Sequence, residues 1–236
     1  MVGLVLFACN TPKKQQKVND RKLVEKLSEK KGYLNALDLK RLKQDFSLNL
    51  LDQYDLSGFD EQDTLAYFVR SGEYVWIASC YLDEDDEASN PFFCLKKETA
   101  KHFKVIRHGK IPSLAGECSY ELNKLLIPVD RYILVSQKSS GSAFCDESPL
   151  IFHRDGKEIY HDERFQIITR NCPDETKAIC FERDFNFEWD QSKHLLVSVR
   201  ERGMNWQTER EISGRSFTLR FALENNRLRF SDTVFH

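Results

Sequence analysis

The eight residues Tyr-Val-Trp-Ile-Ala-Ser-Cys-Tyr, at positions 74–81, decide the class of fold. Most odd-numbered and most even-numbered positions of this stretch are apolar. Because successive side chains of a strand point to opposite faces of a sheet, this pattern predicts that both faces are covered. We therefore expect a central strand that is buried on two sides.

The sequence that follows alternates apolar and polar residues, as strands with one buried face do. Residues 216–223 show this alternation clearly, and Asn225 and Asn226 then supply a two-residue hairpin turn. Candidate turns recur about every 8 to 12 residues after position 70, which is typical of antiparallel sheets. We predict an antiparallel sheet stack or sandwich over residues 71–236.

A second hairpin is predicted around the Asp-Gly pair at positions 155–156. Residues 150–153 and 158–161 flank this pair and read as strands. The expected pairing would place His153 and His161 opposite each other near the turn. We interpret them as cross-strand surface histidines rather than as metal ligands, because no third ligand is evident.

Aromatic residues at Phe185, Phe187 and Trp189 alternate with polar residues at positions 184, 186, 188 and 190. Such a row could form a platform on which a sugar stacks. Packing into the core is favoured, because the acidic residues already occupy the opposite, solvent-facing side.

The N-terminal part is predicted to be helical. Leu23, Val24 and Leu27 form an apolar stripe at helical spacing, Gly32 can end this helix, and a second helix is expected from about Asn35. We expect a helical hairpin, and hence an α+β, mostly β protein. The expected divisions are residues 1–18 (leader remnant and stalk), 19–70 (helical segment) and 71–236 (antiparallel β domain), with 19–236 forming one folded unit.

Composition excludes several classes of protein. The chain has 236 residues, and 35 Lys and Arg residues nearly balance 37 Asp and Glu residues. This balance gives no reason to expect a nucleic-acid partner. No apolar run reaches the roughly 18 residues of a membrane-spanning helix.

The first ten residues change abruptly from an apolar run to a polar segment at Cys9. Leu6-Phe7-Ala8-Cys9 resembles the lipobox of bacterial lipoproteins. The resemblance implies that Cys9 is acylated, that the polar residues after it form a stalk, and that the protein is anchored in the cell envelope. By the same resemblance, Asn10 is compatible with sorting to the outer membrane. The alternative is an apolar strand with an ordinary buried thiol in a cytoplasmic protein.

Six cysteines remain when Cys9 is set aside, an even number that suits an oxidising compartment. We prefer pairing of sequence neighbours, because each pair would close a short loop between candidate strands; the alternative is a set of reduced, buried thiols. No Cys-x-x-Cys motif occurs, and no cysteine lies at zinc-ligand spacing from a histidine pair, so no metal and no cofactor are expected. The preferred pairs are Cys80 with Cys94, Cys118 with Cys145, and Cys172 with Cys180.

An acidic run is the candidate surface for a partner. It consists of Asp83, Glu84, Asp85, Asp86 and Glu87. Five like charges repel one another and favour an exposed loop, which could attract a basic partner by electrostatic steering.

Three functions compete on this evidence. The first is a lipid-anchored envelope protein that binds another macromolecule as an inhibitor, an immunity-type protector or an assembly factor, and it is favoured because no catalytic motif is evident. The second is a secreted hydrolase with dispersed catalytic residues, for which the nominees are Asp146, Glu147, His153 and His161. The third is a cytosolic binding module with reduced thiols.

Overall fold

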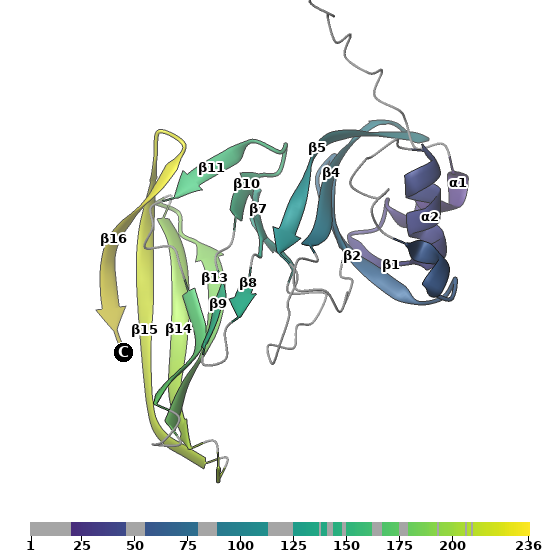
Figure 1. Cartoon of the computed structure of the whole chain (residues 1–236). Coiled ribbons are helices and arrows are strands. Elements are labelled where there is room, and N and C mark those ends of the chain that lie inside the picture. The colour runs from purple at the N-terminus through teal and green to yellow at the C-terminus, as the bar shows by residue number, and fades with distance from the viewer. Residues whose placement is uncertain are drawn as a thin grey trace, which may run out of the picture.

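The computed structural model describes the chain from residue 20 onward, with gaps. The described residues are 20–45, 55–79, 89–112, 125–136, 138–140, 144–147, 150–161, 167–174, 179–192, 194–205, 207–208 and 210–236. They form two sheets that lie beside each other, with the helices on the far side of the first sheet (Figure 1). The prediction of an α+β, mostly β protein built on antiparallel sheets is confirmed.

The first sheet is an antiparallel meander in the order β1-β2-β3-β4-β5. Its strands are β1 (Lys31–Asn35), β2 (Thr64–Ser71), β3 (Tyr74–Ser79), β4 (Ser89–Thr99) and β5 (His102–Pro112). The helices beside it are α1 (Arg21–Lys26), α2 (Ala36–Asp45) and the short 3-10 helix η1 (Leu56–Gly58).

The expected helical hairpin is not confirmed, because a strand separates the two helices. Helix α1 ends at Lys26, and β1 then pairs with β2 in a register that sets Gly32 opposite Phe68. A side chain at Gly32 would lie 2.9 Å from the Phe68 ring, so this glycine leaves room for the ring. Gly32 therefore does not end a helix, as predicted, but allows close packing within the sheet.

Strand β3 lies at the centre of the first sheet and is buried on both faces, as predicted for its residues up to Ser79. Val75 and Ile77 pack into a core shared with the helices. Trp76 and Ala78 point the other way and pack into a core shared with the second sheet. The two-sided apolar pattern of this stretch therefore reflects one covering layer on each face.

The second sheet has 11 strands, in the order β6-β7-β10-β11-β16-β15-β14-β13-β12-β9-β8. All its pairs are antiparallel except β11 with β16. The first six strands in chain order are β6 (Leu126–Val129), β7 (Tyr132–Val135), β8 (Lys138–Ser140), β9 (Phe144–Glu147), β10 (Leu150–His153) and β11 (Glu158–His161). The remaining five are β12 (Ile167–Asp174), β13 (Ile179–Trp189), β14 (His194–Asn205), β15 (Arg210–Glu224) and β16 (Arg227–Phe235).

The second sheet curves around a core of its own. Apolar side chains from β7, β10 and β11, at one side of the sheet, pack with side chains from β13 to β16. Phe187 is 8% exposed and belongs to this core, and Trp189 packs against it. The core interpretation is thus confirmed for Phe187, while the side chain of Phe185 lies outside those described.

Two hairpins form where the turn signals predicted them. Strands β15 and β16 pair around Asn225 and Asn226, which adopt φ values of 49° and 63°. Strands β10 and β11 pair around Gly156, whose φ is 90°. These left-handed conformations are the ones that Asn and Gly tolerate best.

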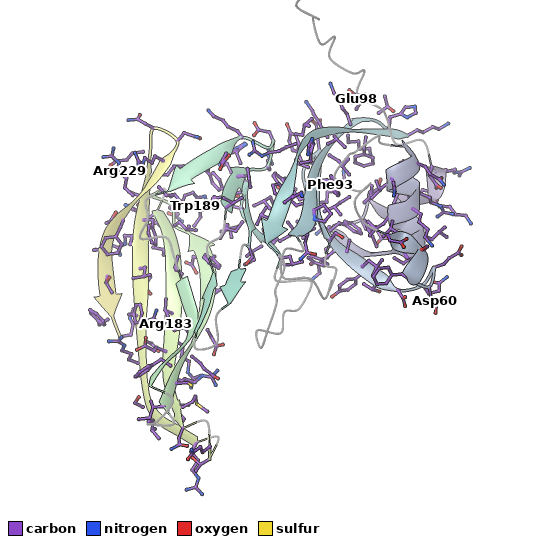
Figure 2. The ribbon with its side chains drawn as sticks, viewed as in Figure 1. Asp60, Phe93, Glu98, Arg183, Trp189 and Arg229 are labelled. Carbon is purple, nitrogen blue, oxygen red and sulfur yellow. The ribbon has the colours of Figure 1, made fainter. Side chains whose placement is uncertain are left out.

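Aromatic packing and hydrogen bonds join the two sheets. Phe152 of β10 lies 5.1 Å from Trp76 and 5.7 Å from Phe92 between ring centroids. The indole N–H of Trp76 donates to the backbone oxygen of Arg154 at 3.1 Å. Figure 2 shows how densely side chains fill the space on both sides of the first sheet.

Candidate functional site

Three hairpin turns of the second sheet surround a hollow of about 550 Å³, which we call the three-turn pocket. They are the β6–β7, β13–β14 and β15–β16 turns. Figure 2 labels Trp189, at the end of β13, between the long strands and β7 and β10. The pocket is lined by Asp130, Arg131, Tyr132, Trp189, Asp190, Gln191, Leu223, Asn225 and Asn226.

The β6–β7 and β15–β16 turns are fixed to the neighbouring β10–β11 hairpin. The side-chain amide of Asn226 donates to the backbone oxygen of Glu158 at 2.7 Å. The backbone N–H of Arg154 donates to the backbone oxygen of Arg131 at 2.8 Å. Asp130, beside Arg131, has a φ of 53°, so this turn also contains a left-handed residue.

Asp190 organises the third turn. One of its oxygens accepts the backbone N–H groups of Ser192 and His194, each at 2.8 Å. The other lies 3.1 Å from Nδ1 of His194. The hydrogen bond from the His194 backbone is the main reason why the pKa of Asp190 is lowered. This carboxylate is therefore committed to shaping the turn.

The floor of the pocket is aromatic. The rings of Tyr132 and Trp189 meet edge to face, with centroids 4.5 Å apart and planes at 82°. Tyr132 also meets His153 edge to face at 5.6 Å. Within the described part of the chain, neither the indole N–H of Trp189 nor the hydroxyl of Tyr132 has a hydrogen-bond partner. Burial raises the pKa of that hydroxyl, so it stays protonated and can donate.

A second polar cluster lies about halfway along the long strands, where Figure 2 labels Arg183. Glu201 of β14 is only 7% exposed and lies opposite Arg183 of β13 and Arg215 of β15. Nη2 of Arg183 is 2.6 Å and Nε of Arg215 is 2.5 Å from the carboxylate. Burial alone would raise the pKa of Glu201, but the two guanidinium groups outweigh it and lower that pKa.

The proposed pairing of His153 with His161 is wrong. The register joins Phe152 to Glu158, so His153 lies beside the turn while His161 lies at the far end of β11, next to Leu228. His153 lies directly before the turn, opposite Lys157, whereas His161 lies four residues farther along β11, so a short turn around Gly156 cannot pair the two histidines. Instead, Nδ1 of His153 lies 3.1 Å from Oδ1 of Asp155.

The other hydrolase nominees, Asp146 and Glu147, lie in β9. Strand β9 pairs with β8 and β12, whereas the two histidines belong to β10 and β11. The strand order therefore separates the acidic nominees from the histidine nominees along the sheet. Their side chains, with that of His161, lie outside those described.

Cys94 is a free, fully buried thiol, so its predicted disulfide with Cys80 is wrong for this structure. Its sulfur points into the core between the sheets and lies 3.7 Å from the backbone oxygen of Arg154. No local pattern around position 94 indicates that it faces the second sheet. Cys180 is 3% exposed, and the side chain of its predicted partner, Cys172, lies outside those described.

Several predicted residues cannot be placed. Cys9, Cys80, Cys118 and the acidic run Asp83, Glu84, Asp85, Asp86 and Glu87 lie outside the described residues. Cys145 and Cys172 lie in β9 and β12, but their side chains are not described. In the part of the chain that is described, no group of three or more metal-ligating side chains occurs.

The three-turn pocket was not predicted from the sequence. Asn225 and Asn226 were expected only to form a turn. For the aromatic row that contains Trp189, a sugar platform was considered, but packing into the core was favoured. The one local feature that could have indicated a binding site was an aromatic residue, Trp189, at the end of a strand beside a turn. Nothing in the sequence showed that three separate turns meet.

Comparison with known proteins yields no relative. No protein-family model, curated protein or solved structure matches this chain. Among the described helices, none has the length and apolar character needed to cross a bilayer.

Proposed function

We propose that this protein is a binding module of the bacterial cell envelope, anchored by lipid on Cys9, and that it engages an envelope macromolecule through the three-turn pocket. The pocket carries the proposal. Its turns are fixed by hydrogen bonds and its floor is aromatic. The indole N–H of Trp189 and the hydroxyl of Tyr132 have no hydrogen-bond partner among the described residues. Convergent polar groups around an apolar floor are typical of a ligand site.

The chemistry of the pocket favours binding over hydrolysis. Glycoside hydrolysis ordinarily needs two carboxyl groups that flank the reacting bond. Of the two carboxylates that line the pocket, Asp190 already accepts hydrogen bonds on both oxygens. Asp130 is left with one neighbouring guanidinium, that of Arg131, whose Nε lies 3.5 Å away.

Support for the envelope comes from the N-terminal sequence and from the cysteines. The lipobox-like segment before Cys9 implies export and acylation. In the β12–β13 hairpin, Asn171 pairs with Phe181 and Asp174 with Ile179, so Cys172 and Cys180 occupy neighbouring positions across the two strands. We propose that these two cysteines form a disulfide, a bond that persists in oxidising compartments.

Metabolic labelling tests the location. Cells that express the protein with its native N-terminus are given labelled palmitate, and the Cys9→Ser variant is the matched control. We expect label in the wild type alone, and a non-reduced tryptic digest should contain a peptide joined through Cys172 and Cys180. Absence of label from both proteins, or recovery of both cysteines as free thiols, would overturn the envelope assignment.

Site-specific crosslinking tests the binding role. A photoreactive amino acid replaces Arg131 at the pocket or Ile212, an exposed residue at the opposite end of β15. In intact cells we expect a distinct adduct from position 131 and none from position 212. Identical patterns from the two positions would contradict recognition at the pocket.

A further inference from the structure

We propose that the three-turn pocket binds a saccharide, presented by the envelope partner as a sugar unit. This inference rests on the proposed binding function and specifies the chemical class of its ligand. It is carried by the combination of an aromatic floor with rim groups that both donate and accept hydrogen bonds. Each sugar ring has the same combination, because hydroxyl groups surround a ring with apolar C–H faces.

The size and rigidity of the pocket suit a small ring-shaped ligand. Its volume of about 550 Å³ falls within the range of roughly 300–1,000 Å³ that is usual for ligand sites. Hydrogen bonds from Asn226 to Glu158 and from Arg154 to Arg131 hold the turns in place before any ligand arrives. Little conformational entropy would then be lost when a ligand binds.

The floor supplies both an apolar surface and polar contacts. Trp189 is held against the core of the second sheet, and Tyr132 meets it edge to face. A sugar can lay its C–H face on such rings while the indole N–H and the phenol O–H bond its hydroxyl groups. Leu223 extends the apolar surface of the pocket.

The charges at the rim favour a neutral, hydroxyl-rich ligand over an ionic one. Asp130 and Arg131 have side chains that are 63% and 58% exposed, and the 3.5 Å separation between them lets the two charges offset each other. The amides of Gln191 and Asn225 each provide donors and an acceptor. A phosphate would meet two carboxylates and one guanidinium at this rim. The carboxylate in excess, that of Asp190, already accepts the backbone N–H groups of its own turn and is not free to hold an ammonium group.

The turn conformations permit substitutions that remove a polar group but keep the backbone. Asp130 and Asn225 have φ values of 53° and 49°, and glycine adopts such values without strain. Asp130→Gly and Asn225→Gly therefore delete a rim group with the turn retained. Trp189→Phe keeps an aromatic ring in the floor and deletes the indole N–H.

The test measures binding of the full chain to an array of neutral and acidic oligosaccharides that includes tri-N-acetylchitotriose, maltotriose, lipopolysaccharide cores and capsular fragments. We expect the wild type to retain at least one neutral saccharide. Asp130→Gly, Asn225→Gly and Trp189→Phe should each weaken that affinity about tenfold, as the loss of one or two hydrogen bonds predicts. Ile212→Ala, at the other end of β15, should bind as the wild type does.

Two outcomes would overturn the saccharide assignment. One is that the wild type retains no saccharide, and the other is that the three pocket variants bind as tightly as Ile212→Ala. Thermal unfolding of each variant shows whether the fold is kept, and Asn225→Gly and Asp130→Gly serve if Trp189→Phe fails to fold. A position-131 adduct with a protein, together with no retained saccharide, would refute this inference and leave the proposed binding role intact.

Discussion

At the scale of single residues, burial decides the chemistry of Cys94. Its side chain is fully buried. In the register of the first sheet, Cys94 pairs with Trp76 of β3 on one side and with Arg107 of β5 on the other. Burial, with a smaller contribution from Asp155, raises the pKa of the thiol well above its usual range, although Arg107 opposes this. Since the thiolate is the reactive form, the folded protein keeps Cys94 inert.

This raised pKa predicts how stability depends on pH. The folded state keeps the Cys94 thiol neutral, whereas the unfolded state releases its proton above about pH 8.5. The contribution to stability is thus complete below that pH and is lost as pH rises. Between about pH 7 and pH 10, the free energy of unfolding should fall by about 2 kcal/mol more in the wild type than in Cys94→Ala. Urea unfolding measures both values, and equal losses would contradict a buried neutral thiol.

The buried Glu201 should matter far more than an exposed glutamate on the neighbouring strand. Glu201→Gln leaves Arg183 and Arg215 without their shared carboxylate, and we expect a loss of about 2 to 3 kcal/mol in the free energy of unfolding. Glu182→Gln is the control, because that side chain is 41% exposed and lies 3.8 Å from Arg202; its effect should stay within about 0.5 kcal/mol.

The loss caused by Glu201→Gln should itself depend on pH. Because the pKa of Glu201 is lowered in the folded state, its contribution is present above the unfolded pKa of about 4.3 and is lost as pH falls. The difference between the wild type and the variant should therefore shrink in acid. A difference that stays constant from neutral to acid pH would show that the charge of Glu201 is not what stabilises the strands.

At the scale of elements, turn chemistry fixes the hairpins. Gly156 of the β10–β11 turn has a φ of 90°, and a methyl group there would approach Ile106 at 3.4 Å, an ordinary contact. Gly156→Ala should therefore lower the free energy of unfolding by about 1 to 2 kcal/mol through backbone strain. Gly58→Ala is the matched control, because nothing lies within 4 Å of the added methyl group and the φ of Gly58 is not positive. Equal effects in thermal unfolding would contradict the strain argument.

Elements with local signals were predicted correctly, and those that depend on distant partners were not. The Asn-Asn and Asp-Gly turns act through the conformations of their own residues, so the sequence alone revealed both hairpins. Strand β1 has no such signal. It forms because its backbone pairs with β2 and Gly32 admits the ring of Phe68, and both partners lie at least 29 residues away in the sequence.

At the scale of the whole molecule, the core between the two sheets should make them unfold together. Phe152 of the second sheet contacts Trp76 and Phe92 of the first, and the guanidinium of Arg107 lies 4.6 Å from the Phe152 ring. Arg107 also forms an ion pair with Glu158 at 2.8 Å. Such shared contacts couple the stabilities of the two sheets.

Phe152→Ala tests this coupling. Removal of the buried ring leaves a cavity, so we expect the free energy of unfolding to fall by about 3 to 5 kcal/mol. Phe235→Ala is the control, because Phe235 is 70% exposed and should contribute little.

Denaturant unfolding followed by tryptophan fluorescence and by far-ultraviolet circular dichroism should give coincident transitions in the wild type. Separate wild-type transitions would show that the sheets unfold independently.

The sequence by itself determined the mostly β class, the two-sided burial of β3 and the positions of the turns, because each follows from periodicity or from residues adjacent in the chain. The tertiary structure decided the rest. The three-turn pocket unites residues 130, 189 and 225, the Glu201 cluster unites three strands, and Cys94 is buried by a sheet that its own strand does not join. These features depend on strand order and register, which arise from contacts between distant segments that no local pattern encodes.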